Sequence, residues 1–295
     1  MNTLAAAKGV PSSEHVDLRQ WIGKKEQSSD VITATPYAAL SATLDWPAER
    51  PPAGTPLPPL WHWLYFLPLY RQADVGPDGH ATRGGFLPPV SLPRRMWAGS
   101  QLDFSRPLRV GDTVSRHSTI VDVTEKQGRT GSLVFVKVRH EIHRADEPSP
   151  ALVEFHDLVY RDLPTAGATA QAPTMAPATP SWERQITPDP VLLFRYSALT
   201  FNGHRIHYDR SYVTEVEGYP GLVVHGPLIA TLLLDLLRRE MPDADVAQFQ
   251  FKAVRPLFDL EAFSVCGRMT GANSVQLWAR SREGWLTMEA TAILR

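Results

Sequence analysis

The pattern of hydrophobic and polar positions divides the chain into two β-rich halves. Alternation of apolar and polar residues is clear in "HSTIVDV" and in "SVQLWARS", and turn residues separate the runs. Such alternation is typical of half-buried strands. We therefore expect three long antiparallel strands at the end of each half. The segments are 113–127, 131–144 and 151–162 in the first half, and 262–271, 273–282 and 285–294 in the second.

Each half also has one candidate helix ahead of its strands. Gly226–Met241 is apolar almost all round, with a proline near its start and basic residues at its end. This pattern predicts a buried helix. In the first half the candidate is Pro59–Arg71, although Pro68 makes its last turn doubtful. The run 192–199 is strand-like.

The two halves resemble each other in sequence order. "RPLRVGDTV" (Arg106–Val114) and "RPLFDLEAF" (Arg255–Phe263) match at one constant offset. Nine residues alone could match by chance, but both segments follow a candidate helix and precede the strands. The shared order favours a duplicated α+β unit, in which a curved antiparallel sheet wraps a buried helix.

An Ala-, Pro- and Thr-rich stretch separates the halves. It has neither helical nor strand periodicity and reads as a linker. We expect a first domain at 1–164, a linker at 165–180 and a second domain at 181–295. The length of 295 residues favours two domains, and 43% hydrophobic residues suffice for two cores.

Charge and cysteine content exclude several function classes. The net charge of −1 and the scattered basic residues show no footprint for nucleic acid. The single cysteine, Cys266, excludes an intramolecular disulfide framework and a cysteine metal cluster. No apolar run approaches the roughly 18 residues of a spanning helix, and the N-terminus lacks a signal-peptide pattern. We expect a cytoplasmic protein with no membrane partner.

The polar cluster "TFNGHRIHYDRSY" (200–212) carries the first candidate chemistry. His207 can hold or release a proton near neutral pH, and Asn202 offers an amide donor and acceptor. Together they could hold one water molecule for addition to an activated double bond, or for the reverse elimination. Alternatively, His207 is an ordinary hydrogen-bonded loop residue. His204 and His207 lack an obvious third ligand, so we expect no metal.

A second stretch, "YPGLVVHGPL", adds a possible oxyanion site. Gly226 heads the predicted buried helix, where its N–H is unpaired and lies at the positive end of the helix dipole. With no side chain there, a thioester oxygen could approach closely. His225 either caps or packs at the helix start, or contacts the substrate.

The two stretches together resemble the MaoC-like (R)-specific enoyl-CoA hydratases, whose motif is D-x-N-P-x-H-x-D. The run "NGHRIHYD" aligns Asn202 with the family's catalytic aspartate, His207 with its catalytic histidine and Asp209 with its trailing aspartate. The resemblance also implies that the Gly226 N–H binds the thioester oxygen. Because asparagine replaces aspartate here, the proton transfers would fall mainly on His207.

A closer resemblance is to fused double hot-dog proteins. These include type 2 hydroxyacyl-thioester dehydratases, mesaconyl-C4-CoA hydratases and itaconyl-CoA hydratases. It rests on the two stretches above and on "LPRRMWAGSQLDFSRPLRVGD" (92–112). It implies two hot-dog domains with one active site in the second half. The first half lacks a comparable Asn–His pair and would shape the pocket.

The resemblance implies reversible hydration of a short carboxylated enoyl-CoA, mesaconyl-C4-CoA or itaconyl-CoA, to citramalyl-CoA. Coenzyme A enters as part of the substrate and no other cofactor is expected. A buried carboxylate needs a partner, and Arg205 and Arg94 rank ahead of Arg95 for that role. Lys252 and Arg255 are candidates for the coenzyme A phosphates.

Two other functions remain open from sequence. A dehydratase of longer 3-hydroxyacyl thioesters would need an apolar tunnel in place of an arginine. A non-catalytic thioester-binding protein is the alternative from another class, because the family's aspartate is absent. A homodimer is expected by analogy with the fold family alone.

Overall fold

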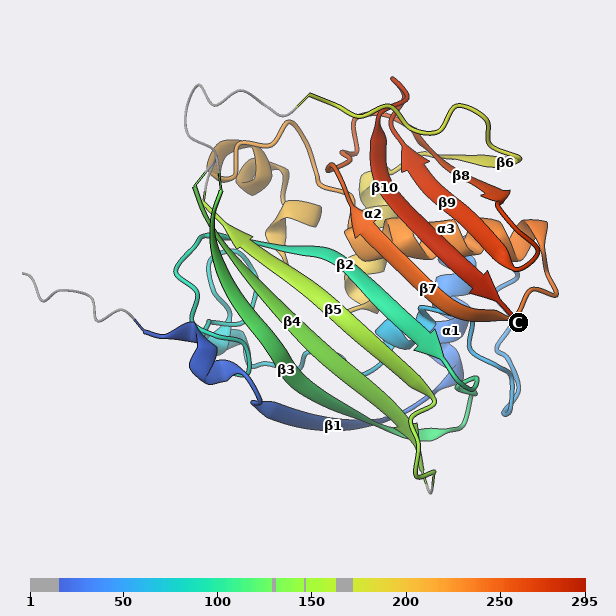
Figure 1. The fold of residues 1–295 in the computed structure, drawn as a ribbon, viewed down its shortest axis with the longest axis horizontal. Coiled ribbons are helices and arrows are strands. Elements are labelled where there is room, and N and C mark those ends of the chain that lie inside the picture. The colour runs from blue at the N-terminus through green and yellow to red at the C-terminus, as the bar shows by residue number, and fades with distance from the viewer. Residues whose placement is uncertain (1–15, 129–130, 146, 163–171) are drawn as a thin grey trace, which may run out of the picture.

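One curved sheet of ten antiparallel strands dominates the fold (Figure 1). The computed structural model describes residues 16–295 apart from 129–130, 146 and 163–171. The strand order is β1-β3-β4-β5-β2-β7-β10-β9-β8-β6. The strands are β1 (Lys25–Val31), β2 (Arg94–Phe104), β3 (Thr113–Gly128), β4 (Gly131–Arg144), β5 (Leu152–Arg161), β6 (Trp182–Ile186), β7 (Val246–Ala253), β8 (Phe263–Met269), β9 (Ser274–Arg280) and β10 (Leu286–Leu294).

The strand order repeats once in the opposite direction, as a duplicated unit requires. The first half contributes β1-β3-β4-β5-β2 and the second contributes β6-β8-β9-β10-β7. The halves meet where β2 pairs with β7, from Gly99 opposite Lys252 to Asp103 opposite Gln248. The six predicted strands correspond to β3, β4, β5, β8, β9 and β10, each within two residues at either end.

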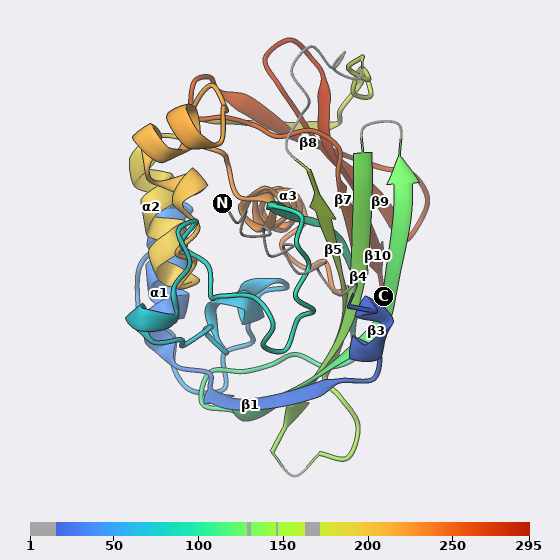
Figure 2. The ribbon, with the colours of Figure 1, turned by 90° about the vertical axis from the view of Figure 1, so that its left-hand side faces the viewer.

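Three α-helices complete the fold of the described residues. They are α1 (Ala34–Thr43), α2 (Pro190–Leu199) and α3 (Gly226–Glu240), which confirms the predicted buried helix. The sheet curves around α3, while α1 and α2 cover the side of α3 that faces away from the sheet (Figure 2). Leucines of α3 such as Leu228 and Leu233 are fully buried in the main core.

Helix α2 corrects the strand-like interpretation of 192–199. The Asp189 side chain accepts a hydrogen bond from the Leu192 N–H at 2.8 Å, and Pro190 is the first helical residue. Both features stabilise a helix start. The Asp-Pro pair was the local signal, and it outweighs the β-type residues that follow.

The predicted first-half helix at Pro59–Arg71 is wrong. The segment forms only a short 3₁₀ turn, Trp61–Leu64. Leu60 and Phe66 have φ values of 70° and 54°, which are left-handed conformations that an α-helix cannot contain.

The broken segment nevertheless occupies the place that corresponds to the start of α3. In the first half the Leu57 N–H donates to the Leu108 carbonyl at 2.7 Å. In the second half the Val224 N–H donates to the Leu257 carbonyl at 2.8 Å. Leu108 and Leu257 are the matched leucines of the sequence repeat, so the chain enters both positions in the same way.

Helices α1 and α2 also end alike. A residue in the left-handed conformation follows each helix, Asp45 (φ 61°) and Phe201 (φ 50°). The next N–H then donates to the carbonyl five residues earlier, at 2.9 Å from Trp46 and at 2.8 Å from Asn202. This is a Schellman-type helix end. Trp46 therefore holds in the first half the place that Asn202 holds in the second.

The division into domains at 165–180 stays a prediction, because the linker lies partly outside the described residues. Within the described part, Met175 forms an isolated bridge with Trp285 of the second half. No helix in the described ranges is both long enough and apolar enough to cross a membrane.

Candidate active site

His207 lies in a 3₁₀ turn (Arg205–His207) that follows α2, and its side chain is buried. Its Nδ1 is 2.6 Å from the Val223 carbonyl oxygen. A carbonyl only accepts, so Nδ1 carries the proton and the lone pair of Nε2 stays free. Burial lowers the pKa of His207 to about 4, although the hydrogen bond to Val223 opposes that effect. The imidazole is thus a neutral base at neutral pH.

His225 supports His207 from one side. The two rings are stacked, with centroids 3.7 Å apart and an angle of 18° between planes. The Nε2 atom of His225 is 2.8 Å from the Ser197 hydroxyl oxygen on α2. Burial, together with the neighbouring His207, holds the pKa of His225 well below its ordinary value. Two neutral rings can stack without charge repulsion, and this fixes the orientation of the base.

Asn202 is tied to His207 through the backbone of the loop. Its Oδ1 accepts a hydrogen bond from the His204 N–H at 3.1 Å, and the His204 ring lies 5.5 Å from the His207 ring. A carbonyl oxygen has two lone pairs. One lone pair of Asn202 therefore remains for a water molecule, beside the amide group.

Gly226 is the first residue of α3, and its N–H has no partner within the helix. A side chain at this position would meet nothing closer than the Trp97 carbonyl oxygen, at 3.9 Å, and the backbone is not left-handed. Neither packing nor conformation therefore requires glycine here. Open space before a helix N-terminus suits the approach of an oxyanion.

A loop of the first half, residues 76–83, packs against this motif. The Arg205 N–H donates to the Asp78 carbonyl at 2.9 Å, and the Arg205 guanidinium donates to the Pro77 carbonyl at 3.0 Å. These contacts bring the His80 ring to 4.1 Å from the His204 ring. Sequence reasoning missed Asp78 and His80. An Asp and a His in a glycine-rich stretch were the available signal.

Asp78, His80 and His204 form a group whose potential ligand atoms lie within 4.8 Å of one another. Both Asp78 carboxylate oxygens already accept hydrogen bonds from His80, from its N–H at 3.0 Å and its Nδ1 at 3.1 Å. Burial would raise the pKa of Asp78, but these hydrogen bonds hold it well below its ordinary value. The hydrogen bonds from His80 leave lone pairs on Asp78 and leave Nε2 of His80 free, so the geometry does not decide whether a metal binds, and the expectation of no metal stays a prediction.

Two of the three candidate arginines have carboxylate partners. Arg94 is buried, with Nε 3.2 Å from a Glu217 carboxylate oxygen. Arg205 binds Asp209 at 2.7 Å. Arg95 forms no ion pair within the described part of the chain. These contacts speak against placing Arg94 and Arg205 ahead of Arg95.

The two candidates for coenzyme A lie elsewhere. Lys252 is exposed on β7 with Nζ 3.7 Å from Glu289, and the preceding Phe251 is buried, so the two side chains lie on opposite faces of the sheet. Arg255 stacks over the Trp285 ring at 5.2 Å. Their assignment to coenzyme A phosphates stays untested.

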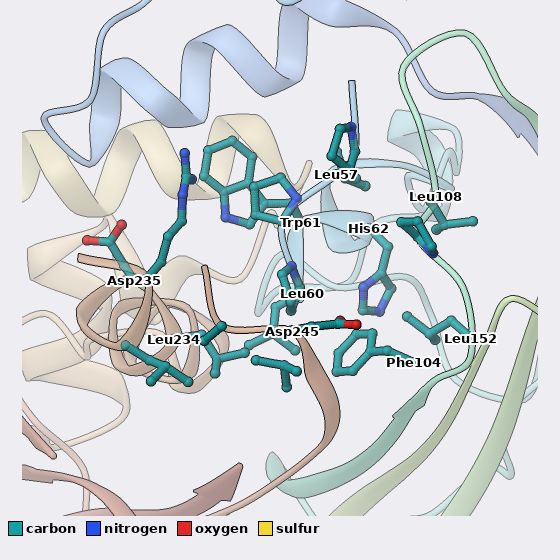
Figure 3. Close-up of a pocket in the computed structure, with 18 of the residues that line it drawn as sticks. Leu57, Leu60, Trp61, His62, Phe104, Leu108, Leu152, Leu234, Asp235 and Asp245 are labelled. Carbon is teal, nitrogen blue, oxygen red and sulfur yellow. The ribbon is translucent and has the colours of Figure 1, made fainter. Parts of the chain in front are cut away.

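A cavity of about 520 Å³ lies between the broken first-half segment and the C-terminal half of α3 (Figure 3). Asn202, His207 and Gly226 are not among its lining residues. Its walls combine that segment and the turn at 106–109 of the first half with residues between 231 and 246 of the second. The residues labelled in the figure are Leu57, Leu60, Trp61, His62, Phe104, Leu108, Leu152, Leu234, Asp235 and Asp245.

Comparison with known proteins adds independent findings. The model of the family "Hydroxyacyl-thioester dehydratase type 2" matches residues 60–259. The chain is 45% identical to the mesaconyl-C(4)-CoA hydratase of Chloroflexus aurantiacus over 94% of this chain and 98% of that protein. It is 28% identical to the mitochondrial hydroxyacyl-thioester dehydratase type 2 of Schizosaccharomyces pombe over 74% and 79%.

Solved structures support the fold. The structure of a MaoC-like dehydratase from Phytophthora capsici has a TM-score of 0.65 and covers 95% of this chain and 98% of its own. A putative MaoC domain dehydratase from Chloroflexus aurantiacus has a TM-score of 0.60, with 98% of each chain covered. The identities are 14% and 13%, so these structures bear on architecture and not on substrate.

Proposed function

The chain belongs to the family of type 2 hydroxyacyl-thioester dehydratases, and on that premise we propose that it hydrates a short carboxylated enoyl-CoA reversibly. Mesaconyl-C4-CoA (3-methylfumaryl-CoA) is the first candidate substrate and citramalyl-CoA the product. Itaconyl-CoA is the second candidate. The support is the 45% identity to a mesaconyl-C(4)-CoA hydratase over nearly the whole of both chains. The reaction class is that of a hydro-lyase.

The observation that carries the chemistry is the tautomer of His207. Its Nδ1–H is held by the Val223 carbonyl, so Nε2 can only act as an acceptor until it takes a proton. A neutral, buried and oriented imidazole is the form that a general base needs. The stacked ring of His225 keeps this orientation.

Hydration then follows in two proton transfers. The water oxygen bonds to the β-carbon while Nε2 of His207 takes one water proton. The electrons of the double bond move to the thioester carbonyl and form an enolate. The imidazolium then returns the proton to the α-carbon as the carbonyl re-forms. The sum is addition of one water molecule, and His207 ends as it began.

Gly226 and Asn202 assist at opposite ends of the reacting bond. The Gly226 N–H and the positive end of the α3 dipole stabilise the enolate oxygen. The free lone pair of Asn202 Oδ1 orients the second hydrogen of the attacking water. The dehydration direction uses the same groups in reverse.

The test is substitution of His207 by alanine. Loss of a general base should lower kcat by roughly 10²–10⁴-fold with a smaller effect on KM. The measurement is the decay of enoyl-thioester absorbance with mesaconyl-C4-CoA. His117→Ala is the matched control, because His117 is exposed on β3 outside the site. A fully active His207→Ala enzyme would refute the assignment.

The wider family suggests a second candidate class of substrate. A relative at 28% identity is named a hydroxyacyl-thioester dehydratase, and the main competitor is a longer 3-hydroxyacyl thioester. Assay of mesaconyl-C4-CoA against 3-hydroxyacyl thioesters of increasing chain length decides between them. No turnover of any thioester would instead favour the binding protein without catalysis. A cytoplasmic location and a homodimer stay predictions.

A further inference from the structure

We infer that Arg95 binds the free carboxylate of the acyl group and that His80, supplied by the first half, lines the same subsite. The inference rests on the proposed function. In mesaconyl-C4-CoA the carboxylate carbon is bonded to the β-carbon, the atom that the water attacks. A subsite for this carboxylate must therefore adjoin His207.

Arg95 has the required position. It lies on β2 directly opposite Tyr160 of β5, and cross-strand partners project to the same face of a sheet. Tyr160 is buried in a core cluster of the first half, so Arg95 projects inward with it. The neighbouring Trp97, also on β2, places its carbonyl oxygen beside Gly226. Arg95 therefore lies two residues along the strand from the predicted oxyanion site.

The charge of Arg95 affects the pKa values of groups in and beside the motif loop. Its guanidinium is within hydrogen-bonding reach of the Tyr160 hydroxyl, and its charge opposes the rise that burial causes in the pKa of Tyr160. Burial also lowers the pKa values of His80, His204 and His156, and the nearby Arg95 charge lowers each further. Arg95 thus acts on three buried rings, of which His204 belongs to the motif loop and His80 to the loop packed against it.

Arg95 has no ion-pair partner among the charged groups around this set, within the described residues. Arg83 is exposed, and its guanidinium donates to the carbonyls of Val90, Leu92 and Pro93. Two carboxylates lie near the rings: Asp78, which accepts both of its hydrogen bonds from His80, and the buried Glu154, which acts on His156. Neither carboxylate pairs with Arg95, which is partly buried. A half-buried cation without a counter-ion favours binding of an anion.

His80 can contribute a hydrogen-bond donor to the subsite when its ring is protonated. Its Nδ1 donates to Asp78, so Nε2 of the neutral ring is an acceptor. A bound carboxylate would favour the protonated ring, because opposite charges raise the pKa of a histidine. Nε2 would then donate to the carboxylate. His204 lies between this ring and His207, with ring-centroid distances of 4.1 Å and 5.5 Å.

The experiment compares substrates that differ only in the carboxylate. Mesaconyl-C4-CoA and 3-methylcrotonyl-CoA share one carbon skeleton, with a methyl group in place of the carboxylate. Arg95→Gln should lower kcat/KM for mesaconyl-C4-CoA by roughly 10- to 150-fold, the range for a hydrogen bond to a charged group. Turnover of 3-methylcrotonyl-CoA should change by less than about threefold. Arg95→Lys keeps the charge without the planar fork and should fall between.

Binding of unreactive analogues separates recognition from chemistry. By titration calorimetry, wild-type protein should prefer succinyl-CoA to butyryl-CoA, Arg95→Gln should lose that preference, and His80→Gln should reduce it. Arg282→Gln is the control, since Arg282 is exposed outside the site. Equal losses on both substrates, or a preference retained by Arg95→Gln, would overturn the assignment. If wild-type protein turns over neither thioester, the proposed function fails first, which is a distinguishable result.

A metal at Asp78, His80 and His204 would give a different result. Activity lost on dialysis against EDTA and restored by Zn²⁺ would overturn the carboxylate assignment for His80. Activity and succinyl-CoA preference that survive EDTA would support it. If Arg95→Gln fails to fold, as judged by circular dichroism, the Arg95→Lys comparison carries the test.

Discussion

The chemistry of this site depends on where one proton resides in the resting protein. Burial keeps His207 neutral, and the Val223 carbonyl fixes its proton on Nδ1. An exposed histidine would be largely protonated in mildly acidic solution, so it would be neither neutral nor fixed in one tautomer. The sequence could indicate the residue type, but the tautomer depends on a carbonyl 16 residues away. No local pattern predicts that contact.

The activity should therefore persist in mild acid. A base with a pKa of about 4 stays deprotonated at pH 6, whereas an unperturbed histidine with a pKa near 6.5 would be about three quarters protonated there. We expect kcat/KM for mesaconyl-C4-CoA to be unchanged between pH 8 and pH 6. A decline with a midpoint near 6.5, in protein that remains folded by circular dichroism, would contradict the buried neutral base.

Asn202 should tolerate the residue of the wider family. A carboxylate at this position can accept the His204 N–H in the same way as Oδ1 of asparagine. We expect Asn202→Asp to retain activity within about threefold, whereas Asn202→Ala loses up to about tenfold, the value of one or two neutral hydrogen bonds. Steady-state kinetics on one substrate rank these variants against His207→Ala. A larger loss in Asn202→Ala than in His207→Ala would reverse their roles.

Among the elements, the loop 76–83 and the motif loop approach each other closely through their backbones. Gly79 has a φ of 90°, and a side chain there would lie 1.8 Å from the Gly203 carbonyl oxygen. The Tyr70 hydroxyl also donates to the Gly79 carbonyl, at 3.2 Å. Only glycine fits, and the fit determines where His80 lies.

Substitution of Gly79 by alanine should damage the site beyond the effect of backbone strain. Gly23 is the matched control, with a φ of 86° and nothing within 4 Å of an added side chain. We expect Gly23→Ala to cost about 1–2 kcal/mol of stability, the penalty of a left-handed residue, with activity retained. Gly79→Ala should lose activity on mesaconyl-C4-CoA by more than tenfold in the protein that folds. Equal behaviour of the two variants would show that the loop contact is unimportant.

The elements with the most regular sequence patterns were the ones predicted correctly. Long alternating segments became β3, β4 and β5, and the fully apolar helix became α3. The short α1 was missed, and the β-type residues of α2 concealed its Asp-Pro start. The prediction of a first-half helix was wrong because Leu60 and Phe66 adopt left-handed conformations, which the conformational preferences of leucine and phenylalanine do not predict.

The same limit applies to the candidate site. The candidate residues His207 and Gly226 were predicted from local order, since all their signals lie within 30 residues, and their roles stay predictions. The ranking of the arginines was made without knowledge that Glu217 pairs with Arg94 and Asp209 with Arg205. His80 joins through contacts 120 residues or more apart in sequence. Only a tertiary structure brings such groups together.

For the whole molecule, buried histidines set the response to acid. Of the histidines in the described part of the chain, six have pKa values lowered mainly by burial, including about 3 for His140 and about 4 for His156. The set is His80, His140, His156, His204, His207 and His225. Well above pH 6.5, at about pH 8, these groups are largely neutral in both the folded and the unfolded state. Below it the unfolded state binds protons that the folded state excludes, so stability decreases.

We therefore expect the free energy of unfolding to fall steadily from pH 7 towards pH 5. Each buried histidine contributes up to about 1.4 kcal/mol per pH unit. Urea denaturation at several pH values gives the slope, and His140→Gln should reduce it by about one proton while His117→Gln leaves it unchanged. A slope of zero, or stability that rises in acid, would contradict the neutral state of these residues.

Trp46 follows α1 as Asn202 follows α2, and this correspondence bears on whether the first half could carry a second active site. Its indole N–H donates to the buried Asp235 at 2.5 Å, and the same carboxylate binds Arg184 and Arg239 at 2.7 Å and 2.8 Å. If an ancestral copy once carried an asparagine there, the tryptophan has since been built into an ion cluster on α3. A Trp46→Asn substitution would remove the indole N–H that Asp235 accepts, and it would still provide no general base. The part of the first half that corresponds to the motif loop therefore serves the packing of α3, and one substitution at Trp46 does not convert it into a second active site.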